Sequence, residues 1–317
     1  MFRKIKNPIL FQGSLKKKNY FEGWYYKMVS HDLSYSLAII PGVSVNKENP
    51  HAFIQLFITN KKGDLKTRYL TYDIKDFLTE DNPFNLSIEN NRFSVDSIDL
   101  LIDDQEISLN GNLHFSNQIK IKTSFFSPSI MGFFSYFKFM ECYHGVISMN
   151  HSIEGKLNID GEIIDFSGGL GYIEKDWGKS FPKEYVWMQC NHFKTEDTSF
   201  MFSEALIPFF GLRFKGLIVN LVVNNQEYRF ATYNSSKVKV KDIKSNQVYY
   251  EIKKGKLRLI VTAINGKTTS LQSPKKGAMI NSIKEGLSGV ISLKLYKNNI
   301  LIFEDEGTQA GLEIMMH

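Results

Sequence analysis

Short runs of alternating apolar and polar residues dominate this chain. Such alternation places every second side chain on the same face of an extended segment, which is typical of a half-buried β-strand. Amphipathic helical periodicity is nearly absent. We therefore expect strands over residues 34–40, 51–59, 93–102, 106–115, 216–223, 257–264, 291–296 and 300–304.

Turn residues separate several of these runs. Asn224-Asn225, Asn265-Gly266 and Asn298-Asn299 each follow a β-rich segment, and such pairs favour tight hairpins. Many short antiparallel strands over 317 residues predict an all-β protein built from barrels or sandwiches. We predict two barrels, over residues 1–150 and 151–317. The boundary is open between 128 and 165, because no Gly/Ser-rich or Pro-rich linker marks it.

Two aromatic segments, residues 130–140 and 207–214, interrupt the alternation. Both are too short to span a bilayer. They either plug the ends of the barrels or form an apolar rim. In the second interpretation Lys138, Arg213 and Lys215 face lipid headgroups and a lipid substrate enters there.

Composition limits the partners. The net charge of +6 is modest for this length, and the lysine pairs and triplets sit among turn residues, so we predict no nucleic-acid partner. Mild attraction to an anionic membrane surface stays open, and so does the oligomeric state. Aromatic residues make up 14% of the chain, enough for a large core or an apolar cavity that holds a hydrophobic small molecule.

Targeting signals are not evident. Cys142 and Cys190 have no metal-type spacing and indicate free thiols in a reducing compartment. The first residues lack the apolar run of a signal peptide, and no apolar stretch of transmembrane length occurs. We therefore expect a cytoplasmic protein, with peripheral membrane contact left open.

The richest chemistry lies in residues 168–178. Glu174 and Asp176 are two residues apart, so on a strand both side chains point to the same face. In an apolar setting two such carboxylates raise each other's pKa, and one can keep a proton near neutral pH. The alternative is a surface pair balanced by Lys175 or Lys179.

A second strand adds polar groups. Trp187, Gln189 and Asn191 share one face, and Val186, Met188, Cys190 and His192 share the other. His144 is a candidate proton carrier. A metal site from Glu141, Cys142 and His144 is awkward on a strand, so we predict no metal. The remaining aromatic candidates either cage a substrate cation or pack in the core; they are Trp24, Trp177, Tyr25, Tyr26 and Tyr172.

In these stretches the chain resembles the tocopherol cyclase family, which is related to the hydroxyneurosporene synthase and AttH-like two-barrel proteins. The motifs that carry the resemblance are Tyr20-Phe21-Glu22-Gly23-Trp24-Tyr25-Tyr26-Lys27, Met140-Glu141-Cys142-Tyr143-His144-Gly145-Val146, residues 171–182, residues 187–191 and Ala310-Gly311-Leu312-Glu313. The resemblance implies two lipocalin-like antiparallel barrels packed together. It also implies that a prenylated quinol closes a chromanol ring without cofactor or metal.

The implied reaction adds a phenol oxygen to an alkene, and it requires an acid, a proton acceptor and a dry cavity. We expect Asp176 or Glu174 to be the acid, and the other carboxylate or His144 to accept the proton. Gln189 and Asn191 would hold the quinol oxygens, and Trp24, Tyr25, Tyr172, Trp177 and Trp187 would wall the cavity. The alternatives are a non-catalytic carrier of lipids or isoprenoids and an isoprenoid hydratase.

Overall fold

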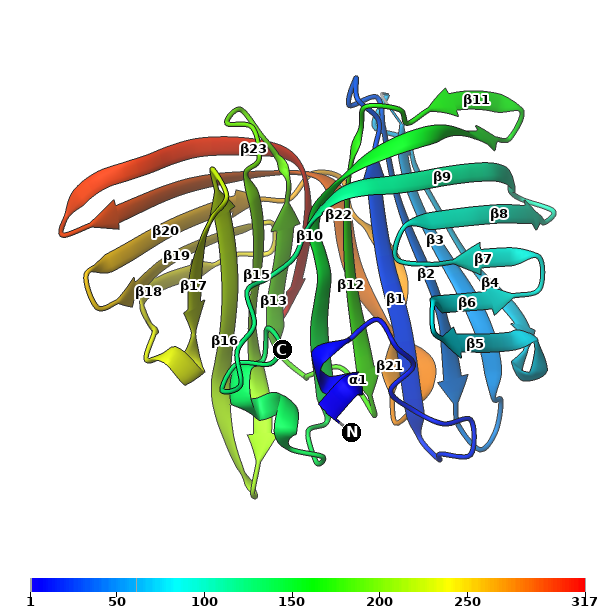
Figure 1. Ribbon diagram of the computed structural model, residues 1–317, viewed down its shortest axis with the longest axis horizontal. Coiled ribbons are helices and arrows are strands. Elements are labelled where there is room, and N and C mark those ends of the chain that lie inside the picture. Colours follow the sequence, from blue (N-terminus) through cyan, green and yellow to red (C-terminus); the bar gives the residue numbers. More distant parts are fainter. Residues whose placement is uncertain (1, 61, 317) are drawn as a thin grey trace. The chain divides into compact units, whose positions relative to one another are not determined.

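The computed structural model describes residues 2–60 and 62–316, and antiparallel strands form most of this part of the chain (Figure 1). The all-β prediction is confirmed. Helical structure within the described residues is limited to α1 (Phe2–Lys6) and the short 3-10 helices η1 (Ile74–Asp76), η2 (Gly132–Tyr136) and η3 (Thr232–Asn234).

The first sheet has twelve strands among the described residues, in the order β4-β3-β2-β1-β12-β10-β9-β8-β7-β6-β5, with β11 on β10. Its edge strands β4 and β5 are consecutive in the chain and joined by η1, as in a sheet that curls into a barrel. The strands are β1 (Tyr20–Val29), β2 (Tyr35–Val45), β3 (His51–Asn60), β4 (Leu65–Asp73), β5 (Phe77–Asp81), β6 (Phe84–Ile88), β7 (Asn91–Phe93), β8 (Ser97–Asp103), β9 (Ser108–Ile119), β10 (Cys142–Ile159), β11 (Glu162–Asp165) and β12 (Leu170–Gly178).

The second sheet has eleven strands in the described part of the chain, in the order β17-β16-β15-β13-β23-β22-β20-β19-β18. β14 pairs with β23 and β21 with β22, and the edge strands β17 and β18 are again consecutive, joined by η3. The strands are β13 (Tyr185–Cys190), β14 (His192–Phe193), β15 (Ser199–Phe209), β16 (Leu212–Val223), β17 (Gln226–Ala231), β18 (Lys237–Ile243), β19 (Gln247–Lys254), β20 (Leu257–Ile264), β21 (Thr269–Lys275), β22 (Ala278–Lys297) and β23 (Ile300–Met315).

Each sheet carries its own apolar core. The first core includes Trp24, Tyr26 and Ile173, and the second includes Val186 and Met188. Fully burying one large apolar side chain contributes about 1.5–3 kcal/mol, so these cores supply most of the stability. Packed side chains occupy both interiors, as in small barrels whose lumen is filled.

Two of the three expected hairpin turns form. Asn224-Asn225 joins β16 to β17 and Asn298-Asn299 joins β22 to β23. All four asparagines have positive φ, which a two-residue type I′ turn requires and asparagine tolerates. Asn265-Gly266 makes no such hairpin, because β20 and the following β21 both pair with β22.

The chain divides into two compact units, residues 1–181 with 271–282 and residues 182–270 with 283–317. The boundary expected between 128 and 165 falls inside the first unit. The reason is strand pairing: β10 lies between β9 and β12, and β12 pairs with β1. The strands after residue 128 therefore complete the first sheet, and the break comes after Phe181.

The two aromatic segments have different structures. Residues 130–140 belong to the connection between β9 and β10 and contain η2, whereas residues 207–214 form the adjoining ends of β15 and β16. Phe139 and Phe210 are exposed, contrary to an interpretation in which the segments only plug barrels, although Ile130 is buried. Across the described residues, no helix is long and apolar enough to cross a bilayer.

Candidate functional site

The alternation of β12 gives the site its two faces. Tyr172, Glu174 and Asp176 alternate with Ile173, Lys175 and Trp177 along this strand, so the two sets point to opposite sides of the sheet. The two carboxylates therefore share a face, as expected. Glu174 is buried, and the side chain of Asp176 is 26% exposed.

His144 joins the two carboxylates. It lies on β10 directly opposite Asp176 of β12, and Nδ1 is 2.9 Å from Asp176 Oδ1. Its other nitrogen, Nε2, is 3.3 Å from Glu174 Oε2. The Tyr172 hydroxyl donates a hydrogen bond of 2.5 Å to the same Glu174 oxygen. The four side chains form one continuous polar chain, here called the proton cluster: Tyr172, Glu174, His144 and Asp176.

The cluster holds a proton on its histidine. Burial lowers the pKa of His144, but the charges of Glu174 and Asp176 outweigh burial and raise it to about 10. The imidazole is therefore a cation between two acids at neutral pH. Burial, followed by the neighbouring Glu174, raises the pKa of Tyr172 well above its usual value, so Tyr172 stays a hydrogen-bond donor.

A divalent cation has a possible donor set here as well. One nitrogen of His144 and one oxygen each of Glu174 and Asp176 lie within 4.8 Å of one another. Imidazole and carboxylate are usual zinc ligands, but an imidazolium cannot bind a metal. A metal would therefore have to displace the proton that the two carboxylates stabilise.

Strand β1 brings two further side chains to the face of the cluster. Tyr25 lies opposite Glu174 and Lys27 lies opposite Tyr172, and residues directly opposite across a strand pair share a face. Both are buried, and Lys27 is only 1% exposed. The sequence reasoning included Tyr25 and missed Lys27. Lys27 is two residues from Tyr25, so alternation along the strand already places both side chains on one face.

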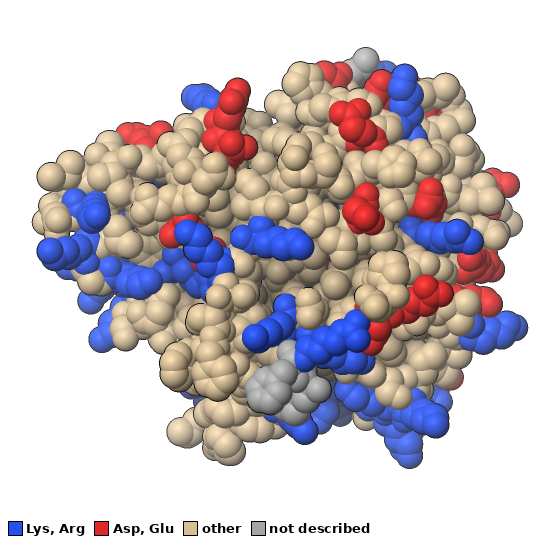
Figure 2. All heavy atoms as spheres, in the orientation of Figure 1, with Lys and Arg blue, Asp and Glu red and all other residues tan. Residues whose placement is uncertain are grey.

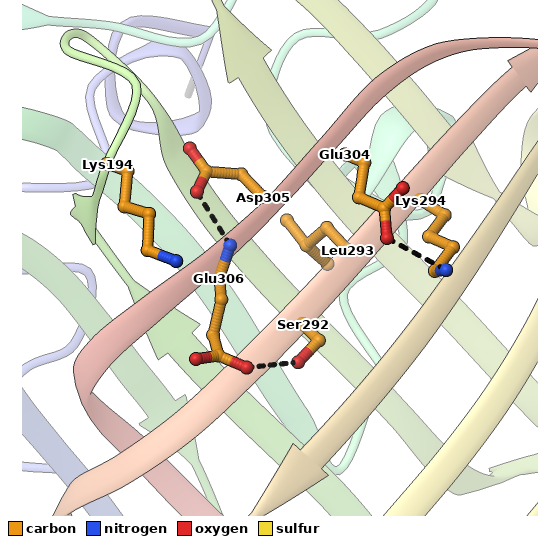
Figure 3. Close-up of a pocket in the computed structure, with 7 residues that line it drawn as sticks. All are labelled: Lys194, Ser292, Leu293, Lys294, Glu304, Asp305 and Glu306. Atoms are coloured by element: carbon orange, nitrogen blue, oxygen red, sulfur yellow. Dashed lines mark hydrogen bonds and ion pairs between the residues drawn. The ribbon is translucent and has the colours of Figure 1, made fainter.

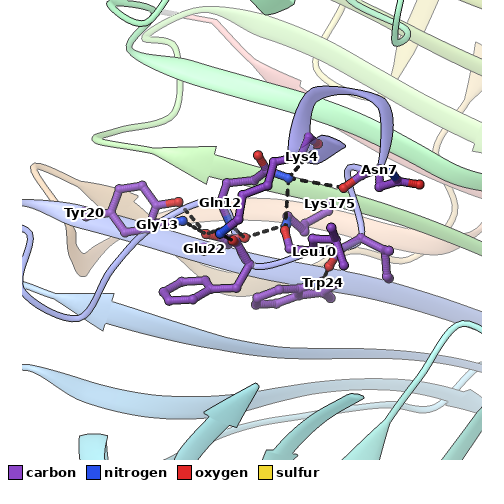
Figure 4. Close-up of polar contacts among 11 residues, drawn as sticks. Lys4, Asn7, Leu10, Gln12, Gly13, Tyr20, Glu22, Trp24 and Lys175 are labelled. Atoms are coloured by element: carbon purple, nitrogen blue, oxygen red, sulfur yellow. Dashed lines mark hydrogen bonds and ion pairs between the residues drawn. The ribbon is translucent and has the colours of Figure 1, made fainter. Parts of the chain in front are cut away.

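The opposite face of β12 carries a second polar group, drawn in Figure 4. Lys175 Nζ lies 2.5 Å from Glu22 Oε1, and both side chains are fully buried. The same ammonium donates to the Leu10 carbonyl and lies 4.5 Å from the Trp24 ring and 5.0 Å from the Trp177 ring. The expected walls Trp24 and Trp177 thus enclose a lysine on the face away from the two carboxylates.

The Glu22–Lys175 pair also fixes the N-terminal segment. Glu22 accepts hydrogen bonds from the backbone N–H groups of Gln12 and Gly13, at 2.8 and 3.0 Å, and from the Tyr20 hydroxyl. Burial lowers the pKa of Lys175 to about 8, although the charge of Glu22 opposes that shift. Lys175 is therefore the partner of Glu22 and not the counter-ion of Glu174 and Asp176.

The residues predicted on the second strand belong to the second unit. Val186, Met188 and Cys190 of β13, which share one face of the strand by parity, enter the second core. Their alternates Trp187, Gln189 and Asn191 are also buried, on the other face of the strand. The structure describes each unit by itself, so a role for these three beside the proton cluster stays a prediction.

The second unit has a surface hollow of about 320 Å³, shown in Figure 3. Several of its polar groups already bind one another: Lys294 pairs with Glu304 at 2.8 Å, and Ser292 donates to Glu306 at 3.1 Å. On the face drawn in Figure 2, Lys and Arg side chains stand in several separate groups and not in one continuous stripe. Neither feature resembles the proton cluster in chemistry.

The sequence of this chain is similar to those of known proteins. A family profile described as "Tocopherol cyclase-like" matches residues 100–315. A probable chloroplastic tocopherol cyclase of Oryza sativa subsp. japonica and a chloroplastic tocopherol cyclase of Zea mays are each 34% identical over 65 residues. These matches span 20% of this chain and 14% of the curated relatives.

Solved structures share the fold at low sequence identity. CghA has a TM-score of 0.61 at 8% identity, over 94% of this chain and 88% of its own. A putative AttH from Nitrosomonas europaea has a TM-score of 0.54 at 11% identity, over 93% of each chain. Kievitone hydratase from Nectria haematococca has a TM-score of 0.52 at 11% identity, over 97% of this chain and 93% of its own. These neighbours support the two-barrel, lipocalin-like fold.

Proposed function

Because the chain belongs to the tocopherol cyclase-like family, we propose that it is a cyclase that closes a ring by adding a phenol oxygen to an alkene of the same molecule. A prenylated quinol is the substrate class with both groups. The observation that carries the proposal is the proton cluster, in which His144 holds a proton between Asp176 and the buried Glu174.

The cluster can deliver that proton through Asp176. Asp176 is the most exposed of the three charged groups, at 26%, so it is the one that a substrate reaches first. A hydrophobic substrate that excludes water disfavours separated charges, and this drives the Nδ1 proton of His144 onto Asp176 Oδ1. The resulting carboxylic acid is the general acid.

The step balances within the cluster and the substrate. Asp176 gives its proton to one alkene carbon, and the phenol oxygen bonds to the carbon that develops cationic character. The phenol proton then returns to a cluster carboxylate or to His144. One C–H bond and one C–O bond form, while the phenol O–H bond and the alkene π bond break. The product is an isomer of the substrate, so the reaction consumes no oxidant, reductant or second substrate.

The hydrogen bond that the Tyr172 hydroxyl donates keeps the Glu174 carboxyl group oriented. A carboxylate at this position stabilises the developing cation. Tyr25 and Lys27 lie on the same face, beside Glu174 and Tyr172.

The two alternative functions, a carrier and a hydratase, require different features of the protein. A carrier of hydrophobic molecules needs an apolar lumen, whereas packed aromatic and aliphatic side chains fill the first core. A hydratase needs the same acid and a bound water, and one fold neighbour is a kievitone hydratase. The mass of the product separates the two enzymes, because hydration adds one water and cyclisation adds nothing.

The test is turnover of a panel of prenylated quinols and isoprenoid alkenes by the protein and its Asp176→Asn variant. The wild type should form isomers of unchanged mass, and the variant should lose about 10²–10⁴-fold in kcat, the usual contribution of a general acid. Asp165→Asn is the matched control, because Asp165 is a half-exposed carboxylate of the same unit paired with Lys156. Full activity of Asp176→Asn would exclude this acid. Saturable binding without any product would indicate a carrier.

A further inference from the structure

The connection between β9 and β10 exposes an unusual number of aromatic rings. This aromatic loop, defined as residues 120–140, contains six Phe, one Tyr and three Lys, and no Asp or Glu. Phe125 is 68% exposed and Phe126 is 79% exposed, and Phe133 and Phe139 are exposed as well. Apolar side chains gathered in this way on a surface mark an interaction site.

The tip of the loop holds its aromatic rings out by its own hydrogen bonds. Ser124 and Ser127 bond to each other through both backbone N–H groups, at 2.9 and 3.2 Å, with Phe125 and Phe126 between them. These central turn positions usually carry Gly, Asn, Asp or Pro, so two phenylalanines there have no folding rationale. The Tyr136 hydroxyl donates to the Phe125 carbonyl at 2.6 Å and braces the turn.

The base of the loop is anchored in the protein. Ile130 and Met140 are buried. Between them aromatic rings stack on one another, and the ring centroids of Phe133 and Phe134 are 4.5 Å apart. The loop is therefore an ordered element that exposes the apolar side chains of Phe125 and Phe126.

We propose that the aromatic loop docks on an anionic lipid membrane, with Phe125 and Phe126 inserted at the level of the headgroups. Charge complementarity selects this occupant: Lys120, Lys122 and Lys138 are exposed, and residues 120–140 include no Asp or Glu. Apolar rings beside lysines are the combination that binds interfacially to anionic bilayers. This docking rests on the loop alone and not on the proposed cyclase activity.

The experiment is flotation of the full chain with vesicles of phosphatidylcholine alone or mixed with phosphatidylglycerol. The protein should float with the mixed vesicles and much less with the neutral ones, and added salt should weaken the binding. Replacing both tip residues (Phe125→Ser, Phe126→Ser) should lower the vesicle partition coefficient at least tenfold. Because both side chains are exposed, the circular dichroism spectrum should not change.

The matched control removes equal apolar exposure elsewhere in the first unit. Leu78 is 63% exposed and Ile163 is 69% exposed, and their replacement by serine should leave flotation unchanged. Equal loss in this control would overturn the proposal, as would failure of the wild type to float. A tip variant that instead converts a dimer to a monomer in size-exclusion chromatography would show that a second copy covers the loop.

Discussion

The buried Glu22–Lys175 pair yields a stability prediction in which the size of the loss depends on which partner is removed. Glu22→Gln should destabilise the protein more than Lys175→Met. The two charged groups keep partners of different kinds once the other is gone: the lysine keeps one hydrogen bond, whereas the carboxylate keeps three. Lys175 retains the Leu10 carbonyl and two tryptophan faces, whereas Glu22 retains two backbone N–H groups and the Tyr20 hydroxyl.

The magnitudes follow from these partners. Breaking a buried ion pair from one side costs about 3–5 kcal/mol, because a charge is left without its counter-charge. We expect Glu22→Gln to show about that loss. After Lys175→Met the carboxylate keeps charge-assisted hydrogen bonds worth about 1.5–3 kcal/mol each, so the loss should be about 1–3 kcal/mol. The double variant leaves neither charge and should be more stable than Glu22→Gln alone.

The stability that the Glu22–Lys175 pair contributes also depends on pH, because Lys175 can lose its proton. The folded pKa of Lys175 is about 8, below its ordinary value of 10.5, so the unfolded state binds more protons between these values. Stability from this group therefore rises as pH increases from about 8 to 10.5. Glu22→Gln removes the charge that raises this pKa, so its loss of stability should shrink as the pH increases.

Urea unfolding followed by tryptophan fluorescence measures these differences, because Trp24 and Trp177 lie beside Lys175. The control is Lys156→Met, which breaks a pair with Asp165 whose side chains are 62% and 51% exposed. It should change stability by at most about 1 kcal/mol. Equal losses for Glu22→Gln and Lys175→Met, or a double variant as unstable as the sum of the two, would refute the reasoning.

Two further predictions concern the proton cluster. The folded pKa of His144 is about 10 against an ordinary 6.5, so its stabilisation is full below about pH 6.5 and is lost as the pH rises through about 10. Melting temperatures across this range should fall in the wild type, and His144→Gln should flatten the profile; equal slopes would contradict the assignment. Zinc should inhibit turnover by displacing the His144 proton, more strongly at higher pH, whereas EDTA should leave activity intact. Loss of activity in EDTA, restored by a divalent metal, would instead make the cluster a metal centre.

Local alternation was enough to predict several features of the site. The common face of Glu174 and Asp176 and the common face of Val186, Met188 and Cys190 both follow from a period of two along one strand. The Asn-Asn hairpins follow from turn chemistry in the same local way. Each of these predictions needs only residues that are close in sequence.

The sequence alone does not predict which distant strands pair, or in which register. The faces of Trp24 and Tyr25 depend on the register of β1 against β12, which sets Trp24 opposite Lys175 and Tyr25 opposite Glu174. A slip of one residue would exchange the two rings, and nothing in either strand alone fixes that register. The same limit explains why Glu22 and Lys27 were missed. It also explains the displaced domain boundary, because the chain alone does not show that β12 returns to β1.

The run Glu174-Lys175-Asp176 can be interpreted only from both the alternation along its own strand and the pairing with distant strands. Its sequence suggests a lysine neutralising its two neighbours, yet alternation sends that lysine to the opposite face, where Glu22 is its partner. The counter-charge for the two acids comes from His144 on β10. His144, the cation between the two carboxylates, therefore carries a transferable proton, whereas Lys175, the cation on the opposite face, holds β12 in place. Substitution of Asp176 should consequently change turnover with little effect on folding, and substitution of Lys175 should change stability first.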